Sequence, residues 1–144
     1  MTDPRAEVVR EILIAARPQT VFSFLVEPVQ LLQWIGHECR LEAVPGGVFR
    51  LDFGNGSVAL GTYREVIPPR RVVFTWGWEG ADAAAGPGTS LVAIDLAPEG
   101  NGTRLRLRHS GLPPTHAHFS AEHHRERWAQ YLDRLARLAS DQVH

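Results

Sequence analysis

Histidines are the residues of this sequence whose types and positions come nearest to catalytic chemistry, because an imidazole can act as general acid or base near neutral pH. His109 alternates with Leu105 and Leu107 in a strand-like run, and His124 precedes Trp128 by one helical turn. Alternate strand residues share a face, as do helix residues four apart, so both imidazoles are expected to meet in the interior. They are the catalytic candidates of this sequence, although neither an oriented nucleophile nor a paired carboxylate accompanies them. The alternative is a pair of core histidines bonded to their neighbours.

A second set of histidines is close enough in sequence to suggest a metal site, because His-x-His near His-His could supply imidazole ligands. The set is His116, His118, His123 and His124. No carboxylate or cysteine stands at a recognised offset from these histidines. Adjacent helix positions diverge, so only one of His123 and His124 can join a given face. We therefore expect solvated histidines, with no bound metal and no cofactor.

Arginine supplies all 15 basic side chains, because lysine is absent. Schiff-base chemistry and the lysine of a phosphate-binding loop are thereby excluded. Arg104, Arg106 and Arg108 alternate along one strand-like run and could contact phosphate groups. With a formal net charge of -1, the expected role of these side chains is pairing with carboxylates on a solvated outer face. We infer no nucleic-acid partner.

Length and composition indicate one folded domain over residues 1–144. A chain of 144 residues can bury about 68% of its unfolded surface, which is enough for a core without metal or disulfide. A hydrophobic content of 44% argues against intrinsic disorder. Cys39 is the only cysteine, so no intrachain disulfide can form, and a cytoplasmic location fits best. No apolar run approaches the roughly 20 residues of a membrane-spanning helix, so no membrane insertion is expected.

The elements that position these side chains are expected in the order strand, two short helices, antiparallel meander and closing helix. Residues 8–15 form an apolar-rich run, and Pro18 suits the first turn of a helix that carries residues 21–26. Pro28 breaks that helix, and a second short helix carries residues 31–35 before Gly36. Extended patterns follow at residues 37–44, 49–53, 57–67, 72–78, 91–96 and 103–109. Turns are expected at Gly46–Gly47, Gly54–Gly56 and Pro98–Gly102.

Two stretches carry most of the information about the fold. Between Gly61 and Trp76, two strand-like runs are joined by Pro68 and Pro69, which lack the amide hydrogens that a β-ladder needs. From Ser120 to Ser140 the pattern is helical, with Ser120 as the expected N-terminal cap. Its apolar stripe repeats at steps of three and four residues and contains Ala121, His124, Trp128, Tyr131, Leu132, Leu135 and Leu138. This helix is expected to lie across the concave face of the sheet, with Trp128 and Leu132 buried and Arg127 near the rim.

Several segments resemble the START-like (SRPBCC, helix-grip) superfamily, most closely its activator of Hsp90 ATPase homologue 1-like branch. These segments are Pro18–Phe22 with Glu27-Pro28 and Trp34, Gly46–Arg50, Gly61–Trp76, Thr103–Leu105, His109–Pro113 and Trp128–Leu135. The resemblance implies an α+β helix-grip (START/Bet v 1-like) fold, in which a curved antiparallel sheet wraps around a long C-terminal helix and two short helices follow the first strand. One departure is Arg127, where the family usually has glycine; its larger side chain is expected to narrow or recharge one end of a cavity.

The resemblance also implies a pocket between sheet and helix for a hydrophobic or aromatic small molecule. Aromatic side chains with a few polar atoms are the usual lining of such pockets. The expected lining is Trp34, Phe49, Leu51, Phe53, Phe74, Trp76, Trp78, His109, His124 and Trp128. The alternative is that these side chains simply fill the core.

Three function classes therefore remain open. The first is non-catalytic binding of a hydrophobic or aromatic small molecule. The second is an enzyme similar to polyketide cyclases or hydrolases that uses the pocket histidines, and the third is a module that interacts with an Hsp90-type chaperone. Fold alone does not decide among them, and a homodimer is also left open.

Overall fold

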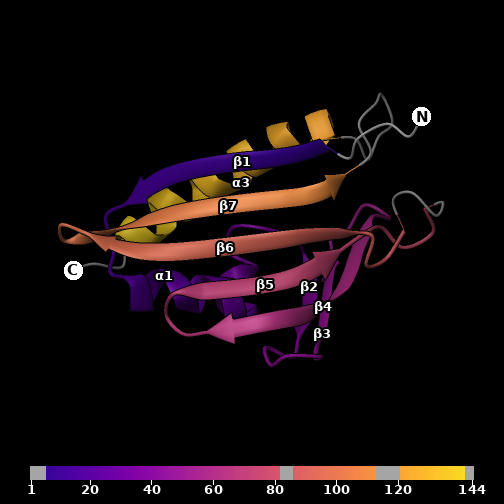
Figure 1. Ribbon diagram of the computed structural model, residues 1–144, viewed down its shortest axis with the longest axis horizontal. Coiled ribbons are helices and arrows are strands. Elements are labelled where there is room, and N and C mark those ends of the chain that lie inside the picture. Colours follow the sequence, from indigo (N-terminus) through magenta and orange to yellow (C-terminus); the bar gives the residue numbers. More distant parts are fainter. Residues whose placement is uncertain (1–5, 82–85, 113–120, 142–144) are drawn as a thin grey trace.

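The computed structural model describes residues 6–81, 86–112 and 121–141 and contains a seven-stranded antiparallel sheet (Figure 1). The strand order is β1-β7-β6-β5-β4-β3-β2, so the first strand lies beside the last. The strands are β1 (Ala6–Ile14), β2 (Glu38–Leu41), β3 (Val48–Asp52), β4 (Val58–Ile67), β5 (Arg71–Trp76), β6 (Ser90–Glu99) and β7 (Gly102–Leu112).

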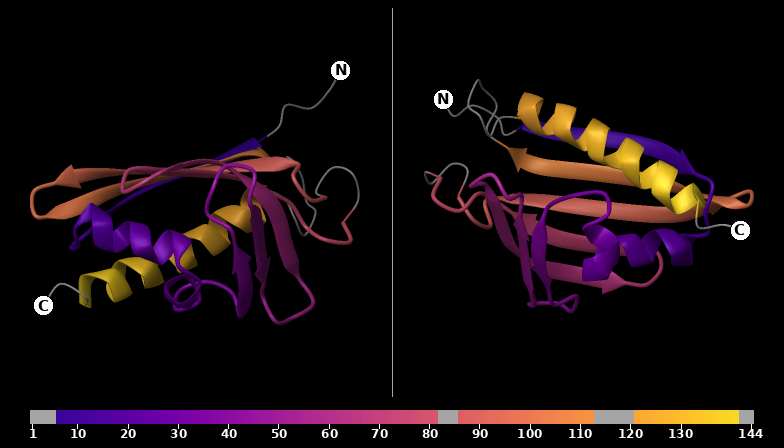
Figure 2. Two further views of the ribbon diagram at one scale, coloured as in Figure 1. Left: turned by 90° about the horizontal axis from the view of Figure 1, so that it is seen from below. Right: turned by 180° about the vertical axis from the view of Figure 1, so that it is seen from behind.

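All three helices of the described chain cover one face of this sheet (Figure 2). They are α1 (Pro18–Val26), α2 (Pro28–Leu31) and α3 (Ala121–Asp141). Helix α3 runs along the concave face behind β1 and β7, while α1 lies against β6 and β7, and α2 contacts the edge strand β2. The structure thus confirms the expected α+β fold, in which a curved antiparallel sheet packs on a long C-terminal helix.

Helix α3 presents the predicted stripe to the sheet. Trp128 is 3% exposed and Leu132 is 1% exposed, whereas Arg127 is exposed to solvent. Burial of one stripe of a helix against a sheet provides most of its stabilisation, because an isolated helix is marginal in water. Ser120, the expected cap of this helix, lies outside the described residues.

Several element boundaries differ from the sequence-based expectation; β7, for example, ends at Leu112 rather than at residue 109. Helix α2 begins at Pro28 and ends at Leu31, so Trp34 and Ile35 follow it in a turn rather than in a helix. Pro28 therefore starts this helix as well as ending the previous one, since proline fits the first helical turn. The β6–β7 turn is also tighter than expected, because Pro98 and Glu99 pair with Thr103 and Gly102 in the ladder.

The connection at Pro68-Pro69 joins β4 to β5 as expected, and its peptide bond is cis. Further along the same pair of strands, Gly61 lies against the backbone of Thr75. A Cβ atom at this glycine would stand 1.9 Å from the Thr75 carbonyl oxygen, so only glycine allows this approach. The Thr75 hydroxyl then accepts a hydrogen bond from the Thr62 amide at 2.8 Å. This local packing fixes the position from which Trp76 projects.

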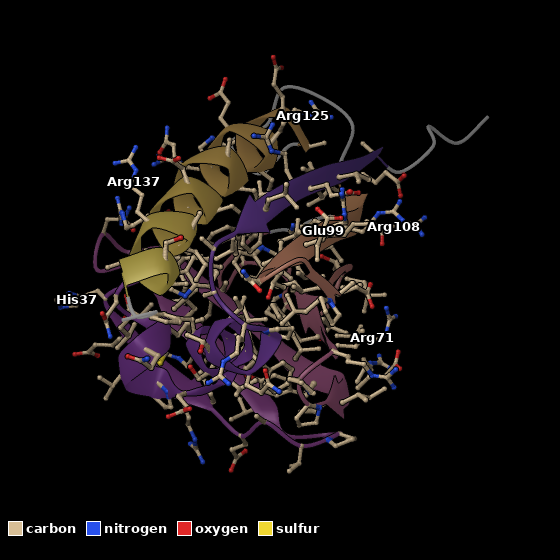
Figure 3. The ribbon with its side chains drawn as sticks, turned by 90° about the vertical axis from the view of Figure 1, so that its left-hand side faces the viewer. His37, Arg71, Glu99, Arg108, Arg125 and Arg137 are labelled. Atoms are coloured by element: carbon tan, nitrogen blue, oxygen red, sulfur yellow. The ribbon has the colours of Figure 1, made fainter. Side chains whose placement is uncertain are left out.

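On the outer face of the sheet, two of the three strand arginines, Arg104 and Arg108, form the expected ion pairs, while none joins Arg106 to a described residue. Arg108 pairs with Glu7 at 2.7 Å, and Arg104 pairs with Glu99 and Glu11. Arg71, Glu99 and Arg108 project from this face in Figure 3. The paired carboxylates offset the positive charge of the strand, as the near-neutral composition suggested. Among the described helices, no segment is long and apolar enough to cross a membrane.

Candidate functional site

The candidate site is a pocket of about 90 Å³ between the region of β3, β4 and β5 and the first half of α3. The turn after α2 contributes Ile35 to its wall, and the β3–β4 hairpin contributes polar side chains at its mouth. The described residues that line it are Ile35, Phe53, Asn55, Ser57, Trp76, Trp78, His123, His124, Arg127, Trp128 and Tyr131. A cavity of this size holds several water molecules or part of an aromatic ring.

Three indole rings form the apolar wall of the pocket. Trp76 ends β5, and Trp78 follows it by two residues, so both side chains lie on the inner face. The two ring centroids are 5.5 Å apart with their planes at 89°, an edge-to-face arrangement. Trp128 of α3 approaches Trp76 from the opposite side, with a centroid distance of 5.6 Å. The pocket is therefore bounded by aromatic surface contributed by both layers of the fold.

Behind this wall, His109 is held by hydrogen bonds at both ring nitrogens. The indole Nε1–H of Trp128 donates to His109 Nδ1 at 3.0 Å, which leaves the proton of a neutral ring on Nε2. That nitrogen lies 2.8 Å from the hydroxyl of Ser90, which itself donates to the Trp76 carbonyl at 2.9 Å. The chain of bonds defines one tautomer of His109 and links α3 to the two central strands.

Burial and a neighbouring imidazole keep His109 neutral. Its side chain is fully buried, and the loss of hydration lowers the pKa of His109 well below its ordinary value of 6.5. His124 lowers that pKa further, because its ring centroid is only 4.9 Å away and two imidazolium charges would repel. The expected meeting of these two histidines in the interior is confirmed.

His124 itself lies on the pocket wall. It is 3% exposed, and its Nε2 accepts a hydrogen bond from the indole nitrogen of Trp78 at 3.1 Å. His123 also lines the pocket, on the solvent side of His124, although the two rings diverge at 87°. The two adjacent helix positions therefore diverge as expected, and the pocket contacts both rings because it extends from the interior to the mouth.

One buried donor on the pocket wall is unsatisfied. Trp76 is 3% exposed, and its indole nitrogen has no hydrogen-bond partner within the described part of the chain. A buried polar hydrogen without an acceptor costs roughly 1–3 kcal/mol. The other such atom is the Tyr63 hydroxyl, whose residue belongs to neither inner cavity. Burial raises the pKa of Tyr63 far above its ordinary value of 10.

The structure divides the sequence-predicted site residues into three groups. Phe53, Trp76, Trp78, His124 and Trp128 line the pocket. Trp34, Phe49, Leu51 and Phe74 surround a deeper space of only about 10 Å³, so these side chains fill the core, with Phe49 and Phe74 stacked at 4.1 Å. His109 lines neither space.

Sequence reasoning did not place five of the lining residues in the pocket, namely Ile35, Asn55, Ser57, His123 and Tyr131. The sequence pattern assigned Tyr131 only to the apolar stripe of the helix. A signal for two of them was present, since His123, Arg127 and Tyr131 follow one another at steps of four and must share a helix face. Asn55 and Ser57 lie in a turn, and their approach to α3 depends on how far the sheet curves. Arg127 stands at the rim as expected.

The charged and metal-binding potential of the site is limited. The lining residues that the structure describes include no Asp or Glu, and Arg127 is the one permanently charged side chain among them. Among residues 6–81, 86–112 and 121–141, no cluster of three or more His, Cys, Asp or Glu side chains could hold a metal ion. His116 and His118 lie outside these ranges. The described geometry can therefore bind an apolar group and order it by a few polar contacts.

Comparison with protein families gives a match over residues 15–140 to the family described as activator of Hsp90 ATPase homolog 1-like protein. Comparison with curated proteins gives no significant match. The matched region contains all the sequence segments that resemble this family.

Solved structures of related proteins share the fold. The chain is 39% identical to an AHSA1-like protein from Rhizobium etli, with a TM-score of 0.74 over 97% of this chain and 87% of the other. A Mesorhizobium loti protein, MLL2253, gives a TM-score of 0.85 at 24% identity, with 96% and 99% covered. An Aha1 from Colwellia psychrerythraea, solved as a dimer, gives 0.80 at 21% identity, with the same coverage.

Proposed function

Because the chain belongs to the activator of Hsp90 ATPase homolog 1-like family, whose fold leaves a pocket between sheet and helix, we propose that it binds a small aromatic or hydrophobic molecule there without transforming it. The pocket offers an aromatic wall on two sides and polar groups at the mouth, which is the usual composition of ligand sites. Its 90 Å³ is small, so the buried part of the ligand is about one ring in size.

The observation that carries this proposal is the unsatisfied indole N–H of Trp76. Core tryptophans normally find an acceptor when they are buried, as Trp34 does with the Phe24 carbonyl at 2.9 Å and Trp128 does with His109. Trp76 belongs to the pocket wall and has no such acceptor in the described structure. A ligand with an acceptor atom beside its ring would restore that bond, so binding would remove the cost of an unpaired donor.

The state of the histidines favours binding over catalysis. Both nitrogens of His109 already take part in hydrogen bonds, and burial disfavours its protonated form, so it has no position from which to exchange a proton with a ligand. His124 reaches the pocket, but its Nε2 accepts from Trp78. Of the two catalytic candidates, only His124 lines the pocket, so the enzyme alternative as stated from the sequence depends on His124. It would be supported if His124→Ala abolished turnover of a bound compound and preserved its affinity.

The chaperone alternative rests on the family description and on relatives of the Aha1 kind. It concerns a surface rather than the pocket, so the two roles can be tested separately. A pull-down against Hsp90 with an ATPase readout decides it. A stimulated ATPase rate that is unchanged by Trp76→Ala would assign the chaperone contact to another part of the molecule.

The test of the proposed function is native mass spectrometry of tag-free protein, followed by identification of any released compound. We expect a stoichiometric aromatic or apolar molecule that is retained by wild type and lost from Trp76→Ala. The matched control is Arg106→Ala, because Arg106 is exposed on the outer face of the sheet and far from the pocket wall. If both variants retain the compound, it is bound elsewhere and the pocket proposal is wrong.

A further inference from the structure

The charge at the pocket mouth points to one class of ligand. Among the described residues of the lining there is no carboxylate, and Arg127 at the mouth is the one permanent charge. On the outer sheet face, Arg71, Arg104 and Arg108 each pair with an acidic side chain, whereas no ion pair joins Arg106 to a described residue. No ion pair joins Arg127 to any described residue.

The helix itself explains why Arg127 is unpaired. Ion pairs on a helix surface form between residues three or four positions apart, as Arg137 and Asp133 do at 2.5 Å. The corresponding neighbours of Arg127 are His123, His124, Gln130 and Tyr131, and none of these is acidic. The guanidinium therefore stays available for a group that enters the mouth, with the imidazole of His123 one helical turn away.

We propose that the ligand carries an anionic group, a carboxylate or a chemically similar oxyanion, which binds Arg127 while its aromatic or apolar body contacts Trp76, Trp78 and Trp128. This inference rests on the proposed function and specifies its ligand. A guanidinium can donate two parallel hydrogen bonds to a carboxylate, which adds orientation as well as attraction. A cationic ligand would meet repulsion from Arg127 and would find no carboxylate among the described residues of the wall.

Three single-ring probes of nearly equal shape test this assignment. Benzoate is anionic, benzamide is neutral and benzamidine is cationic, so only the charge changes appreciably across the series. Binding is measured by titration of the indole N–H resonances in ¹⁵N-labelled protein, which reports each tryptophan separately. We expect the Trp76 and Trp78 resonances to shift, and benzoate to bind on the order of tenfold more tightly than benzamide, with benzamidine weakest. The advantage of benzoate should shrink as salt is added, because rim charges are screened.

Two variants with the same change in net charge identify the responsible side chain. Arg127→Gln should reduce benzoate binding to the level of benzamide and leave benzamide unchanged. Arg125→Gln is the matched control, because Arg125 is exposed on the same helix and absent from the pocket lining (Figure 3). It should leave the tenfold preference intact.

The possible results distinguish a failure of the anionic assignment from a failure of the proposed function. Equal binding of benzoate and benzamide, or a preference for benzoate that survives Arg127→Gln, would overturn the anionic assignment and leave the pocket itself standing. A loss of preference in both variants would show that net charge alone is responsible and would also overturn it. If none of the three probes shifts an indole resonance of the pocket, the proposed function fails together with this inference.

Discussion

The indole Nε1–H of Trp128 donates to Nδ1 of His109 across 3.0 Å, and this bond joins the C-terminal helix to the centre of the sheet. In the neutral ring, Nδ1 is the nitrogen that could accept a proton, and its lone pair already accepts the hydrogen bond from Trp128. The other ring nitrogen lies 2.8 Å from Ser90. The imidazole is thus part of the framework behind the pocket, and its neutral form is the one that the fold requires.

The free energy of unfolding should therefore decrease at acidic pH because of His109. Since the folded-state pKa of His109 lies well below 6.5 and the unfolded ring keeps its ordinary value, the unfolded state binds the extra proton as pH falls below 6.5. The contribution is fully present above that pH and is lost at up to about 1.4 kcal/mol per pH unit below it. Urea unfolding at pH 7.5, 6.0 and 5.0 measures this. In His109→Gln, the part of the acid sensitivity due to this ring should disappear; equal slopes for variant and wild type would contradict the assignment.

Removing Trp128 should destabilise the protein substantially. The side chain is 3% exposed, so Trp128→Ala deletes a buried ring and leaves a cavity, at a cost of about 3–5 kcal/mol. The lower end of that range is expected, because one side of the ring already borders the pocket. Chemical denaturation gives the value. Trp128→Phe keeps most of the ring and loses the donor to His109, so it should cost about 1–3 kcal/mol, and an unchanged midpoint in both variants would remove α3 from the core.

Ligand binding should depend on residues of the inner face of the sheet and not on those of its outer face. With benzoate as probe, binding should quench tryptophan fluorescence and raise the melting temperature by mass action. Trp76→Ala should weaken it, because that ring lines the pocket. Phe74→Ala should act less directly, since Phe74 borders only the narrow deeper space. Arg106→Ala on the outer face should leave binding nearly intact, and equal effects of Trp76→Ala and Arg106→Ala would indicate surface adsorption.

Metal content is expected to be below stoichiometric after gentle, tag-free purification. Elemental analysis by mass spectrometry measures it. The comparison protein is the double variant His116→Ala, His118→Ala, which removes the two histidines that lie outside the described residues. One equivalent of zinc in wild type that is lost from the double variant would reverse this prediction and reopen metal-assisted hydrolysis.

Much of the site's framework could be predicted from local patterns. Alternation in β7 assigned Leu105, Leu107 and His109 to the inner face, and steps of three and four in α3 assigned Trp128 and Leu132 to the core. Both patterns depend only on the period of an isolated strand or helix. The meeting of His109 with His124 followed from the same periods once helix and sheet were placed face to face.

The sequence by itself therefore determined the order of the elements, the face that each one buries and the family to which the segments belong. Only the tertiary structure decided which aromatic rings fill the core and which enclose the pocket, because Phe49, Phe74 and Trp76 all face inward and differ only in their depth along a curved sheet. Only it could show that Trp76 has no acceptor among the described residues while Trp128 has one, and that Arg127 stands at the mouth beside Asn55 and Ser57 of a distant hairpin. Curvature and side-chain depth arise from packing between elements, and no periodicity within one element encodes them.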